Sequence, residues 1–197
     1  MAAGRVCVYA GSSPGARQQY ADAARALGRV LAGRRRGIVF GGSRSGLMGA
    51  LADEALARGG EVIGVIPRYL VEREVAHGAL TDLHVVATMH ERKALMAELA
   101  DAFVALPGGI GTLEELVEML TWAQLGLHGK PVGIVNVDGY YDSLLAFLAH
   151  AVDEGFLSPT TRERLAVQSD PEALLDELDR SVEALAAFPR SDAAELR

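Results

Sequence analysis

The sequence predicts an α/β protein in which a mainly parallel, doubly wound sheet of six or seven strands forms a single Rossmann-like domain. Short runs rich in valine and isoleucine alternate with longer segments of helical period, which is typical of βαβ units. The short runs are apolar on both faces, as in strands that helices cover above and below. Apolar residues make up 50% of the 197 residues, and no Pro/Gly/Ser-rich linker divides the chain.

Each strand is expected where a short apolar run ends at glycine, proline or small polar residues. In chain order the expected strands are 5–10, 37–41, 61–66, 83–88, 101–106 and 131–135. Each helix is expected where apolar residues recur at helical spacing between or after these runs. The expected helices are 16–32, 46–58, 89–100, 111–125, 140–154 and 171–187.

Two segments do not fit this alternation. Residues 67–81 lack a clear period, and we expect a surface excursion after the third strand. The single domain is expected to span residues 1–189, and residues 190–197 are expected to fray.

Composition excludes several classes of protein. The 26 acidic and 19 basic side chains give a net charge of −7, which argues against a nucleic-acid partner because phosphate neutralisation needs a basic face. The one basic run, 34–36, is interpreted as a solvated loop. No apolar stretch approaches the roughly 20 residues that cross a bilayer, so no membrane partner is expected. The single cysteine, Cys7, cannot form an internal disulfide, and we expect a cytoplasmic protein.

Glycines and small polar residues follow the first, second and fifth expected strands, at 11–15, 41–46 and 107–112. Glycine lets a ligand approach the backbone, and the free N–H groups of the next helix favour an anion. Each loop alone could be a tight turn, but together they predict a phosphorylated ligand. None is a Walker A motif or a dinucleotide-binding G-x-G-x-x-G. The candidate ligand-binding residues in these loops are Gly11, Ser12, Ser13, Gly42, Ser43, Gly108, Gly109, Ile110, Gly111 and Thr112.

The most specific pattern is P-G-G-x-G-T-x-x-E at 107–115. The chain also contains G-L-M-G at 46–49 and M-H-E-R-K at 89–93. With these motifs the chain resembles, over nearly its whole length, the LONELY GUY family of cytokinin riboside 5'-monophosphate phosphoribohydrolases, which are often mislabelled lysine decarboxylases. The resemblance implies hydrolysis of the N-glycosidic bond of adenosine 5'-monophosphates, typically N6-substituted, to the free base and ribose 5-phosphate. It also implies a homodimer, with residues 121–126 bordering the interface.

Carried over position by position, the resemblance makes Arg92 and Glu115 the catalytic residues. It assigns substrate contacts to Glu74 and Lys93, and the phosphate to the glycine-rich loop at 108–112. The second loop departs from the family pattern, because Gly41, Gly42 and Ser43 stand where three glycines are usual.

The implied reaction suits these side chains. Breaking the bond builds positive charge on the ribose, which a carboxylate stabilises while it orients water. The leaving purine becomes electron-rich, which a guanidinium stabilises. No step needs a metal or an organic cofactor, and no Cys/His cluster has ligand spacing, so neither is expected. Lysine decarboxylation needs pyridoxal phosphate on a lysine, and it is rejected because Lys93 directly follows the position of the catalytic arginine and Lys130 lies in a loop before a strand.

Several alternatives stay open at this level. Thr112 and Glu115 could form a helix capping box, as Thr88 and Glu91 are expected to do. The methionines at 89, 96 and 119 and the tryptophan at 122 suit a core or an interface better than a substituent pocket. The protein could also be a general purine nucleotide nucleosidase acting on AMP, or a non-catalytic nucleotide or cofactor carrier.

Overall fold

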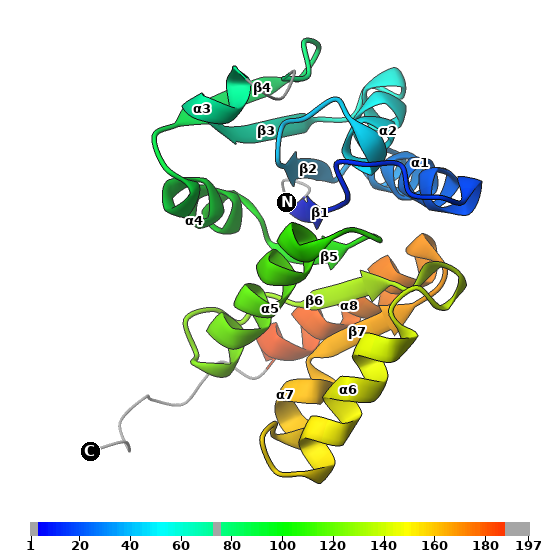
Figure 1. Ribbon diagram of the computed structural model, residues 1–197, viewed down its shortest axis with the longest axis vertical. Helices are drawn as coiled ribbons and strands as arrows, with labels where there is room; N and C mark the ends of the chain where they lie inside the picture. Colours follow the sequence, from blue (N-terminus) through cyan, green and yellow to red (C-terminus); the bar gives the residue numbers. More distant parts are fainter. Residues whose placement is uncertain (1–3, 73–75, 188–197) are drawn as a thin grey trace.

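The structure, a computed structural model, describes residues 4–72 and 76–187. Within them seven strands form one sheet in the order β4-β3-β2-β1-β5-β6-β7, and every neighbouring pair is parallel (Figure 1). The strands are β1 (Arg5–Tyr9), β2 (Gly37–Phe40), β3 (Val62–Pro67), β4 (Asp82–Val86), β5 (Ala102–Ala105), β6 (Val132–Val135) and β7 (Leu165–Gln168). The predicted doubly wound, Rossmann-like sheet is confirmed, and β7 is the strand that the sequence did not locate.

The long helices match the predicted segments closely. They are α1 (Gln18–Gly33), α2 (Gly46–Ala57), α4 (Met89–Leu99), α5 (Ile110–Gln124), α6 (Asp142–Asp153) and α8 (Pro171–Ala187). Three short elements were not expected: α3 (Arg68–Val71), the 3-10 turn η1 (Val137–Gly139) and α7 (Pro159–Glu163). The first of these begins the excursion after β3.

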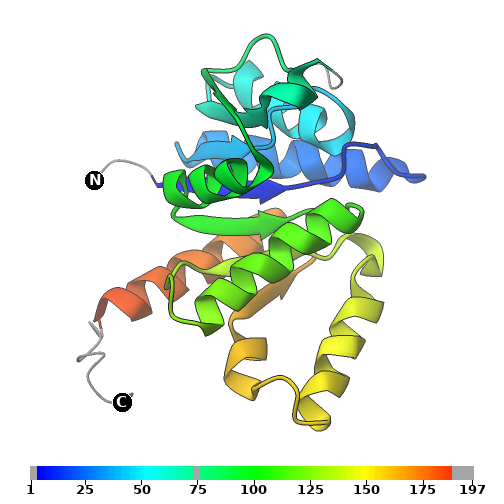
Figure 2. The ribbon, with the colours of Figure 1, turned by 60° about the vertical axis from the view of Figure 1, so that its left-hand side comes forward.

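Helices cover both faces of the sheet, and each face has its own apolar core. Side chains of α1, α2 and α8 form one core with the sheet, with Leu27, Leu51 and Leu174 fully buried. Side chains of α4, α5 and α6 form the other, in which Met96 and Met119 are 1% exposed, as expected of core residues. Figure 2 shows α4 and α5 lying on the same face of the sheet.

The chain reverses its direction of winding at β1, which lies between β2 and β5. In open parallel sheets such a switch point leaves a crevice at the carboxyl ends of the strands, where ligands bind. The three glycine-containing loops meet here: Gly11 N donates to Pro107 O (3.0 Å), and Leu47 N donates to Gly11 O (3.0 Å). A Cβ at Gly46 would lie 2.4 Å from the Ser12 carbonyl carbon, so this contact requires glycine.

The sequence suggested that the basic run at 34–36 is a solvated loop, but two of its arginines form ion pairs with another helix. Arg34 Nη2 lies 2.6 Å from Asp176 Oδ1, and Arg36 Nη1 lies 2.5 Å from Asp179 Oδ1. Both acceptors belong to α8, which packs against α1. The run therefore joins the end of α1 to the last helix.

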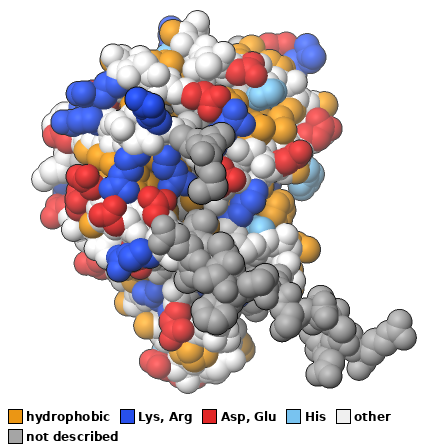
Figure 3. Space-filling view, turned by 180° about the vertical axis from the view of Figure 1, so that it is seen from behind, with side chains coloured by type: hydrophobic (Ala, Val, Ile, Leu, Met, Phe, Trp, Pro, Cys, Tyr) orange, Lys and Arg blue, Asp and Glu red, His pale blue; other side chains and the backbone are white. Residues whose placement is uncertain are grey.

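On the face shown in Figure 3, acidic and basic side chains are interspersed rather than gathered by sign. None of the helices among residues 4–72 and 76–187 is both long and apolar enough to cross a membrane.

Candidate active site

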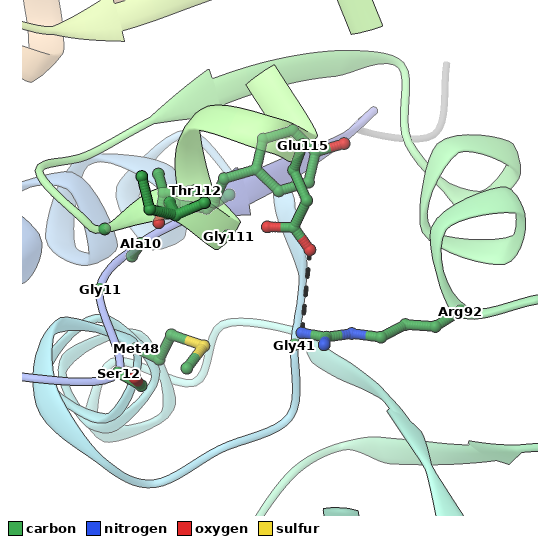
Figure 4. Close-up of a pocket in the computed structure, with 13 residues that line it drawn as sticks. Ala10, Gly11, Ser12, Gly41, Met48, Arg92, Gly111, Thr112 and Glu115 are labelled. Atoms are coloured by element: carbon green, nitrogen blue, oxygen red, sulfur yellow. Dashed lines mark ion pairs between the residues drawn. The ribbon is translucent and has the colours of Figure 1, made fainter. Parts of the chain in front are cut away.

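A cavity of about 320 Å³ lies at the carboxyl ends of β1 and β5, on the side of the sheet that α4 and α5 cover. This volume falls in the range of small-molecule sites. Figure 4 shows the side chains of Arg92, from α4, and Glu115, from α5, pointing into the cavity. Met48 and Ser12 lie across the cavity from Glu115. The lining residues are Val8, Tyr9, Ala10, Gly11, Ser12, Gly41, Met48, Arg92, Gly109, Ile110, Gly111, Thr112 and Glu115.

The first turn of α5 forms one wall and provides an anion site. The first intrahelical bond there is donated by Leu113 N to Gly109 O (3.1 Å), so the amides before Leu113 have no acceptor within the helix. A Cβ at Gly109 or Gly111 would meet nothing within 4 Å, which leaves space for a ligand against this backbone. Free amides and the helix dipole together favour a phosphate group.

The start of α5 also decides the capping-box alternative for Glu115. The helix begins at Ile110 with Gly109 at its N-cap, so Thr112 lies inside the first turn and cannot be the N-cap residue. Glu115 therefore does not close a Thr112 capping box. Its side chain, 14% exposed, turns into the cavity instead (Figure 4).

Helix α4 begins with Thr88 as the expected N-cap, and Glu91 reaches back one residue beyond it, which together fix the turn that carries Arg92. Thr88 Oγ1 accepts from Glu91 N (3.1 Å), and Glu91 Oε2 accepts from Ala87 N (2.9 Å). Arg92 Nη1 lies 3.5 Å from Met89 Sδ. A Cβ at Gly41 would lie 2.1 Å from Arg92 Nη2, so the guanidinium occupies space that only glycine leaves at the end of β2.

Arg92 and Glu115 face each other without closing a hydrogen bond. Nη2 and Oε1 are 3.9 Å apart, beyond the range of an N–H···O bond, and both side chains are largely buried. Among the described residues Arg92 Nε has no hydrogen-bond partner. A buried donor without a partner costs free energy, so this pair is poised to bind a group that enters the cavity.

Burial also changes the acid–base chemistry of the site. It raises the pKa of Glu115 from 4.5 to about 7, and the Arg92 guanidinium opposes that rise. A carboxyl group that titrates near neutral pH can exchange a proton with water or substrate during a reaction. The cavity thus holds a fixed cation opposite a carboxyl group suited to general acid–base work.

The structure brings together most, but not all, of the residues that the sequence singled out. Of the catalytic and loop candidates, those lining the cavity are Gly11, Ser12, Arg92, Gly109, Ile110, Gly111, Thr112 and Glu115. Ser13 and Gly108 line an adjoining cavity of about 300 Å³. Glu74 lies outside the described residues.

Three candidates have other surroundings. Gly42 has a φ of +77° and its carbonyl accepts from His77 N (3.0 Å), and its neighbour Gly41 lines the cavity instead. Ser43 is fully buried, and its Oγ accepts from Ser45 N (3.1 Å). Lys93 is not part of the cavity lining, because its ammonium group lies between two α5 carboxylates.

Sequence reasoning missed five lining residues, of which Gly41 is one. Val8, Tyr9 and Ala10 end or follow β1, and Met48 stands in the first turn of α2. The G-L-M-G motif contained Met48, and the contact of Leu47 N with Gly11 O brings that turn to the cavity. Among the described residues no group of three or more His, Cys, Asp or Glu side chains is placed to hold a metal ion.

Comparison with known proteins identifies relatives over most of the chain. Residues 48–178 match the model of a family described as "Possible lysine decarboxylase". A cytokinin riboside 5'-monophosphate phosphoribohydrolase of Arabidopsis thaliana is 50% identical over 175 residues, 89% of this chain and 81% of the relative. An enzyme of the same name from Rhodococcoides fascians is 51% identical over 171 residues, 86% of each chain.

Solved structures with lower identity share the fold. The molybdenum cofactor carrier protein of Chlamydomonas reinhardtii aligns with a TM-score of 0.68 at 19% identity, covering 92% of this chain and 99% of that one. The molybdenum cofactor binding protein of Rippkaea orientalis aligns with a TM-score of 0.67 at 22% identity, covering 91% and 98%. At these identities the likeness concerns the fold alone.

The raised pKa of Glu115 predicts a pH-dependent stability. The folded protein holds this proton more tightly than the unfolded chain, so the contribution is present at acidic pH and is lost as pH rises from about 4.5 to about 7. Glu115→Gln cannot ionise and avoids that loss. We compare the free energy of unfolding of Glu115→Gln with that of the parent at about pH 5 and pH 8. From the lower to the higher pH, the difference should shift in favour of the variant by on the order of 2–3 kcal/mol.

Urea unfolding at both pH values measures this difference. Glu114→Gln is the matched control on the same helix, because it leaves Glu115 in place, and its stability relative to the parent should change far less between the two pH values. Equal relative stability of Glu115→Gln at the two pH values would show that Glu115 titrates as an ordinary carboxyl group.

Proposed function

The chain belongs to the family of the cytokinin riboside 5'-monophosphate phosphoribohydrolases, and on that premise we propose how its site hydrolyses the N-glycosidic bond of adenosine 5'-monophosphates. The products are the free base, a cytokinin when the N6 position is substituted, and ribose 5-phosphate. The observation that carries the proposal is the facing pair of Arg92 and Glu115, one helical turn from a row of free amides. The proposed reaction uses no organic cofactor and no metal.

The phosphate binds at the N-terminus of α5, against the amides at 110–112. Glu115 lies three residues beyond Thr112, about 4.5 Å along the helix axis, so a ribose held by its phosphate brings its anomeric carbon toward the carboxylate. As the bond to the base breaks, positive charge develops on the ribose. The carboxylate stabilises that charge and accepts a proton from the water that attacks the anomeric carbon.

Arg92 acts on the leaving group. The electron pair of the broken bond moves onto the purine, and a guanidinium beside the ring stabilises it or donates a hydrogen bond to a ring nitrogen. The purine takes up a proton from water and leaves as the free base, and Glu115 returns its proton to solvent. Arg92 Nε, buried and unpartnered among the described residues, supplies a donor that is free to do so. Met48 and Ile110 add apolar surface to the cavity, which suits a hydrophobic N6 substituent.

The surroundings of the two lysines disfavour the reaction named in the family description. Lys93 Nζ donates to Glu114 and Glu118, and Lys130 Nζ donates to Ala97 O (2.7 Å). Forming a Schiff base needs a neutral amine. Burial lowers the pKa of Lys93, but its hydrogen bonds to Glu114 and Glu118 outweigh burial, so the pKa is raised and the amine stays protonated. We therefore assign phosphoribohydrolase rather than lysine decarboxylase activity.

We further propose a cytoplasmic homodimer. Cys7 is buried as a free thiol, which suits a reducing compartment. Apolar side chains stand exposed along α5 and the loop after it, including Val117 (47%), Leu125 (67%) and Leu127 (68%). An exposed apolar patch of this kind favours association, and closed twofold symmetry is its commonest outcome.

Light scattering at micromolar concentration should give the mass of a dimer. Leu125→Glu combined with Leu127→Glu should shift the mass toward the monomer because it places charges in the patch. A monomeric parent protein at that concentration would contradict the proposed dimer.

The anion site predicts that the 5'-phosphate is essential. Charge-assisted hydrogen bonds from several amides are lost with a nucleoside, so kcat/KM for adenine release should fall by roughly 10²-fold or more from AMP to adenosine. Base release from AMP, N6-isopentenyl-AMP, IMP and CMP then ranks the bases.

Faster turnover of the N6-substituted nucleotide supports cytokinin nucleotides as substrates, and a preference for unsubstituted AMP supports a general purine nucleotide nucleosidase. Equal turnover of adenosine and AMP would contradict the phosphate site. Binding of all these nucleotides without base release would indicate a carrier.

A further inference from the structure

Lys93 stands next to Arg92 on α4, yet its side chain reaches away from the cavity to α5. Its Nζ donates to Glu114 Oε1 (2.5 Å) and to Glu118 Oε1 (2.9 Å). The Lys93 side chain is only 10% exposed and that of Glu118 is 22% exposed. The pair with Glu118, shielded from water on both sides, acts more strongly than a pair on the surface, while Glu114 is half exposed.

The two acceptors flank the proposed catalytic carboxylate. Glu114 precedes Glu115 in the chain, and Glu118 follows it by three residues, which places it nearly one turn along the same helix. Three carboxyl groups therefore crowd one turn of α5. The cations that face them come from consecutive residues of α4: Arg92 opposite Glu115, and Lys93 between Glu114 and Glu118.

In this arrangement Lys93 can act on the carboxylates beside Glu115 without contacting the substrate. Resting on the proposed function of Glu115, we propose that Lys93 is a positioning residue: it ties α4 to α5 beside the reacting pair and neutralises Glu114 and Glu118, so that Glu115 can carry its charge opposite Arg92 near neutral pH. Lys93 touches neither the base nor the phosphate in this account.

The charges around Glu115 determine whether removing a neighbour raises or lowers its pKa. The cations Arg92 and Lys93, from α4, lower the pKa of Glu115, while Glu114 and Glu118, on its own helix, raise it. On β1, burial raises the pKa values of Cys7 and Tyr9, so both stay neutral in the relevant pH range. Removal of the Lys93 charge must therefore raise the pKa of Glu115, and removal of the Glu118 charge must lower it.

The test compares Lys93→Met and Glu118→Gln in the full-length protein. The acid limb of the kcat/KM profile for adenine release from AMP, recorded between about pH 5 and 9, reports the ionisation of the free enzyme. We expect its midpoint to move up by about one pH unit in Lys93→Met and to move down in Glu118→Gln. Lys93→Arg should restore the parent midpoint because it keeps the charge.

A matched control removes a cation that pairs with a glutamate far from the cavity. Arg58→Met breaks the contact between Arg58 Nε and Glu54 Oε1 (2.8 Å) on the side of α2 and should leave the midpoint unchanged. A midpoint that stays in place in Lys93→Met, with kcat lower or KM higher at every pH, would overturn the proposal. Should Lys93→Met fail to fold, the opposite shift required of Glu118→Gln still decides the matter.

A second measurement separates this proposal from the proposed function. The carboxyl carbon of Glu115, labelled with ¹³C and assigned by its absence in Glu115→Gln, can be titrated by NMR without substrate. The midpoint should move in the same two directions in Lys93→Met and Glu118→Gln. If the parent protein released no base, the proposed function would fail while this titration still tested Lys93, and unmoved midpoints would overturn the role of Lys93 whatever the activity.

Discussion

Burial of the Glu115 carboxyl group opposite the Arg92 guanidinium is the interaction on which the site depends. In the apolar interior the carboxylate is costly, and its pKa rises to about 7. A fully formed salt bridge would lower that pKa, but the 3.9 Å separation keeps the guanidinium from closing one. The result is a carboxyl group near its midpoint and a cation with a donor to spare, both facing a space that a nucleotide can enter.

The rest of the fold holds the guanidinium and the carboxyl group apart and facing each other. Arg92 comes from the capped first turn of α4, Glu115 comes from α5, and both helices lie on the same face of the sheet. The switch of winding direction at β1 opens the crevice between them and the glycine loops. Gly41 makes room for the guanidinium, and glycines at 109 and 111 leave the α5 amides accessible. Small residues therefore determine the shape of the site as much as the charged ones do.

Much of this could be predicted from the sequence because the signals were local and repeated. Alternating apolar runs predicted six of the seven strands, and the 107–115 motif placed Glu115 at the start of a helix. The strand β7 was missed because Leu165–Gln168 holds only three apolar residues, set between Arg164 and Gln168, and follows the short helix α7 directly. Glycines mark a loop but not which of its residues face the ligand, so Gly42 was chosen where Gly41 lines the cavity. Nor could spacing show that Lys93 reaches α5, since that contact joins residues 21 and 25 positions apart.

The turnover of Glu115→Gln, measured together with its affinity for AMP, shows whether the Glu115 charge takes part in breaking the glycosidic bond. Glutamine has nearly the shape of glutamate but lacks its charge, so we expect a folded protein that still binds AMP and releases adenine on the order of 10²–10³-fold more slowly. Glu114→Gln, whose side chain points about 100° away around the helix, should lose far less. A Glu115→Gln protein that keeps most of the parent turnover would contradict the account, because the charge opposite Arg92 would then play no part in breaking the bond.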